Sequence, residues 1–102
     1  MATVEELTAR LTKALAGGEG FGHSVKLNLK KDGVIHVDGT RVSNEDLPAD
    51  LTVTISMKDL EALGRRKLDP MAAIMTGRMK LSNMGLAMQL QPKIQALFQN
   101  IA

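Results

Sequence analysis

The stretch from residue 68 to residue 90 constrains the fold most, because its hydrophobic pattern changes from helix to strand and back to helix with almost no connecting sequence. Asp69 followed by Pro70 has the form of a helix N-cap with proline at the first helical position. Gly77 can adopt the left-handed conformation that ends a helix. The spacing between these signals predicts a helix of about two turns.

A strand and a second helix follow directly. Met79 and Leu81 alternate with polar residues between positions 78 and 82, which is typical of a short half-buried strand. Asn83 is a candidate N-cap for a helix that begins at Met84. Helix, strand and helix are therefore expected to follow one another with almost no loop between them.

The order of these motifs resembles that of the sterol carrier protein 2 (SCP2) family. Members of this family carry a similar Leu-Asn/Asp-Pro, then Met-Thr-Gly-Lys/Arg, then Asn-Met-Gly-Leu-Ala-Met-x-Leu, before a last helix. The resemblance is densest over residues 67–91 and extends more loosely to residues 51–57 and the sequence before them. It implies a small stand-alone bacterial SCP2 domain that fills residues 1–102. Two departures are a shorter turn before Asn83 and the near absence of aromatic residues.

The remaining sequence predicts the other elements. Residues 3–16 place apolar side chains on one stripe of a helix, and Thr3 with Glu6 fits a capping box. Residues 51–57 alternate between apolar and polar and predict a strand. Ser56 is a candidate cap for the helix that follows.

Residues 21–42 predict a β-hairpin whose register depends on the length of its loop. A three-residue loop at 31–33 sets Leu29 opposite Ile35 and keeps apolar residues together. A two-residue loop would place leucines opposite polar residues, so the three-residue loop is preferred. His36 then lies on the other face of the hairpin, which is expected to be solvated.

Together these elements predict an α+β domain with a largely antiparallel sheet, of which one face is exposed to solvent and the other is covered by helices. Four strands are predicted directly, and a fifth is expected within residues 40–43. The SCP2 resemblance implies about five strands, helices over one face and an apolar tunnel between them.

The composition excludes several classes of function. The chain has no cysteine, which rules out zinc–cysteine sites, thiol catalysis and disulfides. A net charge of +2 and only two aromatic residues do not suit a nucleic-acid-binding protein, which needs clustered basic residues and stacking aromatics. We find no signal peptide, membrane-spanning run or peroxisomal ending, and therefore expect a cytoplasmic protein.

No catalytic or metal site is predicted. His23 lies next to Ser24, and His36 near Asp38, but neighbours in a strand face opposite sides and no Gly-x-Ser-x-Gly elbow is present. Two histidines with scattered carboxylates do not form a metal site. We therefore expect no enzyme activity, no metal and no cofactor.

The last predicted helix, from Met84 to Ile101, has an apolar arc of about 200° when it is projected at ~100° per residue. This arc exceeds what one core contact needs, so we expect the helix also to contact a ligand or another subunit. Gln91 falls inside the arc, and Pro92 predicts a kink or break beside it. Gln91 either binds a polar group of a lipid, as the resemblance implies, or lies at the kink with water or a free carbonyl as its partner.

Methionine is the remaining signal, with seven in the chain. Its flexible and polarizable side chain adapts to varied neighbours, and spacings of four place pairs on one helix face. Ordinary core packing explains such a stripe, whereas the SCP2 resemblance favours a lipid cavity. The lining predicted for that cavity, with Gln91 as its polar contact, is Val53, Ile55, Leu63, Met71, Ile74, Met75, Met79, Leu81, Met84, Met88, Ile94 and Phe98.

The function predicted with this resemblance is the non-catalytic binding and transfer of fatty acids, fatty acyl-CoA, sterol-like or isoprenoid lipids. The alternative is an interaction module that dimerises, or that presents a lipid intermediate to a biosynthetic enzyme such as one of quinone synthesis. Residues 65–67 with Arg78 and Lys80 are either a solvated surface or a contact for anionic membranes or a coenzyme A head group. The expected partners are thus a lipid, transiently a membrane surface, and in the alternative a second copy.

Overall fold

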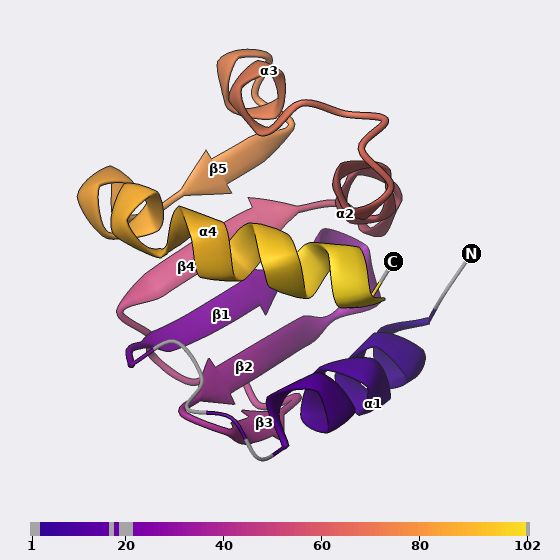
Figure 1. The fold of residues 1–102 in the computed structure, drawn as a ribbon, viewed down its shortest axis with the longest axis vertical. Helices are drawn as coiled ribbons and strands as arrows, with labels where there is room; N and C mark the ends of the chain where they lie inside the picture. Colours follow the sequence, from indigo (N-terminus) through magenta and orange to yellow (C-terminus); the bar gives the residue numbers. More distant parts are fainter. Residues whose placement is uncertain (1–2, 17, 19–21, 102) are drawn as a thin grey trace.

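The computed structural model describes residues 3–16, 18 and 22–101, with side chains as far as residue 96. Within this part of the chain the elements follow the predicted order of helix, hairpin, strand, two short helices, strand and helix (Figure 1). They are α1 (Val4–Leu15), β1 (Ser24–Asn28), the 3₁₀ turn η1 (Lys30–Asp32), β2 (Val34–Asp38), β3 (Arg41–Ser43), β4 (Leu51–Ile55), α2 (Met57–Gly64), α3 (Pro70–Met75), β5 (Met79–Leu81) and α4 (Met84–Ile101).

The described strands form one sheet in the order β3-β2-β1-β4-β5. β1 and β4 run parallel at its centre, and all other neighbours are antiparallel. The parallel pair arises because residues 44–50 carry the chain from β3 at one edge back past β2 to the far side of β1. The predicted α+β class and the largely antiparallel five-stranded sheet are confirmed, including the short strand expected within residues 40–43.

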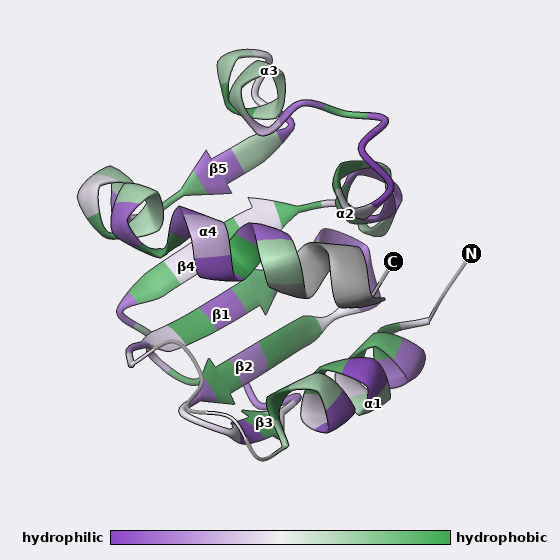
Figure 2. Cartoon of the chain, in the orientation of Figure 1, coloured by the Kyte–Doolittle hydropathy of each residue, from purple (hydrophilic) through white to green (hydrophobic). Residues whose placement is uncertain are grey.

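The hydrophobic core lies between the sheet and the helices that cover one of its faces (Figure 1). Alternate residues of β1 and β4 are buried, and the same alternation is visible in the hydropathy of the strands (Figure 2). On α1, Leu7, Leu11 and Leu15 recur at four-residue spacing, and all three are buried. The core therefore uses the three leucines of this helix, and Val4 packs against it.

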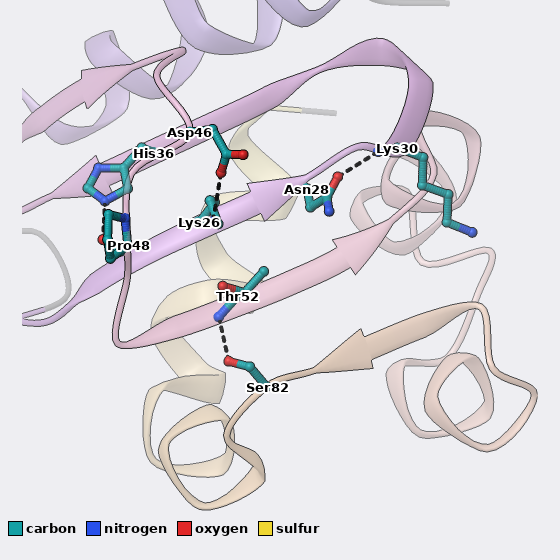
Figure 3. A network of polar contacts seen from close by, with 8 residues as sticks. All are labelled: Lys26, Asn28, Lys30, His36, Asp46, Pro48, Thr52 and Ser82. Carbon is teal, nitrogen blue, oxygen red and sulfur yellow. Dashed lines mark hydrogen bonds and ion pairs between the residues drawn. The ribbon is translucent and has the colours of Figure 1, made fainter.

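The predicted register of the hairpin is wrong by two residues. Ile35 lies opposite Leu27, so the connection between the strands spans residues 29–33. A shift of two leaves every side chain on its predicted face, and the hydrophobic pattern therefore did not distinguish the two registers. Local contacts favour the longer loop: the Asn28 side chain accepts a hydrogen bond from the Lys30 N–H (3.1 Å), and Lys30 has a left-handed φ of 58° (Figure 3).

The second face of the sheet is partly covered, although the sequence pattern predicts it as solvated. Residues 44–50 cross this face (Figure 3), and His36, expected to be solvated, is 5% exposed beneath them. The His36 Nε2–H donates to the Pro48 carbonyl oxygen at 3.0 Å. Lys26 on β1 donates to the Asp46 carboxylate at 2.8 Å. Polar contacts thus hold this connection on the sheet.

Two predicted boundaries also change. The strand expected to reach Met57 ends at Ile55, because Ser56 caps α2 by accepting a hydrogen bond from the Asp59 N–H (3.1 Å). Met57 is instead the first residue of α2 and is buried. α4 continues as one helix through Pro92, so a break at this proline is wrong, and a kink stays a prediction. Its contacts with both α1 and α2 compensate for the one backbone hydrogen bond that proline removes.

Replacing Lys30 by glycine tests the observed register. Glycine adopts a left-handed φ without the Cβ penalty, so Lys30→Gly is expected to raise the free energy of unfolding by about 0.5–1 kcal/mol. Lys31 has no left-handed backbone, and Lys31→Gly is expected to lower that free energy by a similar amount. Urea denaturation measures both effects. Destabilisation by Lys30→Gly would instead support the three-residue loop, in which Lys30 belongs to the strand.

Candidate functional site

A cavity of about 260 Å³ lies between α3, β5 and α4, and its floor comes from β4 and α2. These elements gather at the β5 edge of the sheet (Figure 1). Most of the lining is apolar, and twelve of the fourteen lining residues fall within residues 69–95. The lining consists of Val53, Leu63, Asp69, Pro70, Met71, Ile74, Met79, Leu81, Met84, Ala87, Met88, Gln91, Ile94 and Gln95.

The wall formed by α3 is fixed at both of its ends. The Asp69 carboxylate accepts a hydrogen bond from the Ala72 N–H (3.1 Å), and Pro70 occupies the first turn. Ala73, in the middle of the helix, is fully buried. Gly77, with a φ of 77°, turns the chain into β5. The predicted cap and the predicted turn are both present.

The wall formed by β5 is attached to β4. Met79 pairs with Ile55, and Met79 and Leu81 both line the cavity. Ser82 extends the ladder by one residue: the Thr52 N–H donates to the Ser82 Oγ (2.8 Å), and the Ser82 N–H donates to the Thr52 carbonyl (3.0 Å) (Figure 3). A three-residue edge strand is thereby held more firmly than its length suggests.

The wall formed by α4 begins at the predicted cap. The Asn83 side chain accepts a hydrogen bond from the Leu86 N–H (3.1 Å), and the Asn83 backbone carbonyl accepts one from the Ala87 N–H (2.9 Å). Only Ser82 and Asn83 separate β5 from the helix, so the cap sets the direction in which α4 leaves the sheet. Met84 is the first of six α4 residues that line the cavity.

Ten of the thirteen residues predicted from the sequence line this cavity, and their role in binding a ligand stays a prediction. Ile55 instead lies in the core with no exposed surface. Met75 is 81% exposed and outside the lining, because α3 ends there and the residue lies beyond the cavity wall. Phe98 lies outside the described side chains. The ten are Val53, Leu63, Met71, Ile74, Met79, Leu81, Met84, Met88, Gln91 and Ile94.

Four lining residues were not predicted as part of the site: Asp69, Pro70, Ala87 and Gln95. Gln95 follows Gln91 by four residues, and that spacing places both amides on one face of α4. Asp69 and Pro70 had been assigned only to the start of α3, and the start of this helix also borders the cavity. The spacing of the glutamines was thus a usable signal in the sequence.

The polar groups of the lining are few. Asp69 is the one ionisable residue among the described residues that line the cavity, and Gln91 and Gln95 add two amides. The lining set contains no lysine, arginine or histidine. A carboxylate bound here would meet one negative charge and no cation, whereas an uncharged head group would find both donors and acceptors.

Three of the lining methionines are also exposed to solvent. Met71 is 58% exposed, Met84 46% and Met88 62%, so these three residues form the rim of the opening. The methionine side chain is unbranched and has several rotatable bonds, which lets it move aside without a change in the helices. The width of the opening is therefore adjustable by side-chain rotation.

The groups that carry most catalytic chemistry lie elsewhere. His23 Nδ1 is 3.5 Å from the Asp50 carboxylate in an exposed position before β1, and His36 lies under residues 44–50. Among the described residues, no group of three or more His, Asp and Glu is placed to hold a metal ion. Over the same residues, none of the helices combines the length and hydropathy that a membrane-spanning helix needs.

The fold and the site define a class: a small α+β domain with an apolar cavity at one edge of the sheet, closed by its last helix. Residues 1–95 match the SCP-2 sterol transfer family. The chain belongs to that family, which confirms the resemblance carried by residues 67–91.

Relatives and solved structures agree with this assignment. Sterol carrier protein 2 from rabbit (Oryctolagus cuniculus) is 46% identical over 54 residues, which cover 52% of this chain and 10% of that protein. The human protein is 43% identical over the same length. The crystal structure of Sterol Carrier Protein 2 Like 2 from Aedes aegypti is 26% identical, with a TM-score of 0.69 over 85% of this chain and 92% of that chain.

A second structure from Aedes aegypti shows the same fold. The solution structure of palmitated SCP2L2 is 24% identical, with a TM-score of 0.65 over 91% of this chain and 95% of that chain. The match to the curated relatives therefore spans about a tenth of their length, whereas the match to these structures spans nearly all of theirs.

Replacing Asn83 tests whether its cap holds the α4 wall. Asn83→Ala removes the acceptor for the Leu86 N–H and is expected to lower the free energy of unfolding by about 1 kcal/mol. Asn83→Ser retains a capping oxygen and is expected to change it by a few tenths of a kcal/mol. Denaturation in guanidinium chloride compares the two variants. An equal loss in both would show that the cap is not the cause.

Proposed function

We propose that this chain binds the apolar part of a lipid in the cavity between α3, β5 and α4 and transfers it through the cytoplasm without catalysis. One observation carries the proposal: a member of the SCP-2 sterol transfer family has an open apolar cavity with a methionine rim. The fold shared with a palmitated protein supports an acyl ligand. Fatty acids, fatty acyl-CoA, sterol-like and isoprenoid lipids are the candidate classes.

The size of the cavity bears on how a long chain binds. The volume of about 260 Å³ lies just below the roughly 300–1,000 Å³ of common ligand sites. Burying part of a chain, about nine methylenes, gives a gross gain of about 7 kcal/mol, from which the loss of ligand freedom must be subtracted. A chain of about sixteen carbons gains nearer 12 kcal/mol if the rim methionines move aside. We therefore propose that the rim opens when a long lipid binds, which lengthens the cavity toward the implied tunnel.

The polar groups of the lining favour an uncharged head group. Asp69 repels a carboxylate near the opening, and no basic lining residue offsets this repulsion. Gln91 and Gln95 can each donate to and accept from a hydroxyl or carbonyl. One such hydrogen bond contributes about 1 kcal/mol net, so it orients the ligand and adds little affinity. We propose that long-chain alcohols and similar neutral lipids bind more tightly than free fatty acids.

Native mass spectrometry of freshly purified protein tests the proposed function directly. A stoichiometric lipid adduct that is lost on organic extraction would support a carrier and identify the class of its cargo. A bare mass, together with no uptake of a fluorescent fatty alcohol at micromolar concentrations, would contradict it.

Replacing Met88 by tryptophan tests the site. The larger side chain at the rim displaces about two methylenes of a bound chain, so Met88→Trp is expected to weaken lipid binding about tenfold. Met75→Trp is the matched control, since Met75 is exposed outside the lining and its replacement is expected to leave the affinity unchanged. Fluorescent lipid titration measures both. Unaltered binding in the Met88 variant would show that the lipid does not bind at this rim, and loss of folding would favour a solid core over a cavity that binds ligand.

Replacing Asp69 by asparagine tests the preference for a neutral head group. Asparagine also caps helices, so Asp69→Asn keeps the start of α3 and removes the negative charge of the lining. Palmitate affinity is expected to rise about threefold to tenfold, and hexadecanol affinity to stay constant. Competition titrations with both lipids measure the difference. Equal changes for the two ligands would show that charge at this position does not select the head group.

The alternative, an interaction module, would use the exposed methionine rim as a contact with a second copy or with an enzyme. Dimerisation through the rim would make the mass depend on protein concentration and would shield Met71 and Met88 from oxidation. Sedimentation over a wide concentration range distinguishes this function from a carrier that works as a monomer.

A further inference from the structure

We propose that the three rim methionines, Met71, Met84 and Met88, form a reversible oxidation site that controls the release of lipid. In this proposal peroxides convert their thioethers to sulfoxides, and the cavity then binds its lipid less tightly. The inference rests on the proposed function, because it adds a chemical modification to the same lipid site.

Methionine sulfur is concentrated where solvent and the cavity meet. Among the described residues, five large apolar side chains are exposed, and four of them are methionines of α3 and α4. The hydrophobic core instead consists mostly of leucine, isoleucine and valine, and its methionines are Met57 and Met79. The opening thus carries oxidisable side chains, whereas most of the core carries side chains that peroxides do not attack.

The rest of the chain offers little competition for a peroxide. The chain has no cysteine, so its seven methionines hold all of its sulfur, and it has no tryptophan or tyrosine. Met57 and Met79 are 2% and 7% exposed, so an oxidant in solution reaches their sulfur atoms only through motion of the core. Oxidation is therefore expected first at the rim and at Met75, which are exposed.

The oxidation transfers one oxygen atom and two electrons. A lone pair of the thioether sulfur attacks the outer oxygen of the peroxide, the O–O bond breaks, and an S–O bond forms. The departing oxygen keeps the bonding pair and takes up the proton of the attacked oxygen. Sulfur is oxidised to the sulfoxide, and the peroxide is reduced to water or, for a lipid hydroperoxide, to the lipid alcohol.

The sulfoxide changes the rim from apolar to polar. Its oxygen is a hydrogen-bond acceptor, and burying such an acceptor against an alkyl chain without a partner is unfavourable. An oxidised rim residue is therefore expected to turn toward solvent and lose its contact with the lipid. Loss of the contact with about two methylenes weakens binding about tenfold.

Gln91 adds to this effect. It lines the cavity three residues after Met88, and that spacing places the two side chains next to each other on α4. Once Met88 is a sulfoxide, its oxygen can accept a hydrogen bond from the Gln91 amide, which is then no longer available to the head group of the lipid. Oxidation would thus weaken both the apolar and the polar contacts of the ligand.

The modification is reversible by an external reductant. Two thiols return a sulfoxide to the thioether, with a disulfide and water as the products, and methionine sulfoxide reductases catalyse this reaction. This chain has no thiol of its own. The proposed cycle therefore needs a thiol-dependent methionine sulfoxide reductase as its partner.

Titration with a fluorescent fatty alcohol before and after treatment with hydrogen peroxide tests the proposal. The affinity of the unaltered chain is expected to fall about tenfold and to recover after treatment with a thiol and reductases for both sulfoxide epimers. A variant with Met71→Leu, Met84→Leu and Met88→Leu has apolar side chains of similar volume and no sulfur at the rim. The peroxide is expected to change the affinity of this variant less than about twofold. Met75→Leu is the matched control and is expected to lose affinity as the unaltered chain does, since Met75 lies outside the lining.

Peptide mass spectrometry identifies which sulfur atoms have been oxidised. An unchanged affinity although the rim residues are sulfoxides would overturn the proposal, as would an equal loss of affinity in the triple leucine variant. Urea denaturation checks the fold, because the rim lies outside the core and its oxidation is expected to leave the free energy of unfolding nearly unchanged. A loss of affinity that accompanies unfolding would contradict control at the rim.

A second oxidant distinguishes two sources of peroxide. Free hydrogen peroxide is expected to oxidise Met75, which is 81% exposed, ahead of the rim. The hydroperoxide of linoleyl alcohol is expected to oxidise the rim ahead of Met75, because binding in the cavity holds it beside the rim. That reversal would support bound lipid as the oxidant, and the same order with both would support peroxide in solution. Absence of rim sulfoxides with either oxidant would overturn the proposal.

The titration before oxidation separates this proposal from the carrier function. No binding of fatty alcohol by the untreated chain would refute both, since a site without a ligand has none to release. Binding that rim oxidation leaves unchanged would refute the oxidation site alone and leave the carrier function standing.

Discussion

The cavity depends on the ladder between β4 and β5. β5 has three residues, yet α3 ends just before it and α4 begins just after it, so its position fixes two of the cavity walls. The reciprocal hydrogen bonds between Thr52 and Ser82 lengthen the ladder, and the caps at Asp69 and Asn83 fix the starts of the two helices. Backbone geometry therefore places the walls. The side chains on those walls can therefore change conformation without moving the walls.

Burial changes from the floor of the cavity to its rim. Val53 and Leu63 on the floor are buried, whereas the rim methionines are about half exposed or more. The floor belongs to the close-packed core, where adding or removing one methylene changes the stability of the fold. The rim lies outside that core. Rigidity at the floor and adaptability at the rim are what a site for chains of varied length requires. The basic residues fall on the sequence segment that forms the rim, but none of them lines the cavity.

Local signals in the sequence predicted local structure well. The caps at Asp69 and Asn83, the turn at Gly77 and the apolar faces of the four directly predicted strands were all predicted, because each depends on residues within one turn or on a period of two. The register of the hairpin was not, since a slip of two residues preserves every face. The buried position of His36 depends on a hydrogen bond to Pro48, twelve residues away, which no periodic pattern records.

The site was predicted to the extent that it follows periodicity. Residues on the apolar faces of β5 and α4 do line the cavity, but Met75 shares the helix face of Met71 by spacing and still lies outside, because α3 stops at that residue. The polar part of the lining was harder to predict, since Gln95 on an amphipathic helix is ordinarily a surface residue. It reaches the cavity because α4 begins at the Asn83 cap beside β5 and packs against α1 and α2. The head-group chemistry of the site thus depends on a helix direction that hydrophobic periodicity does not specify.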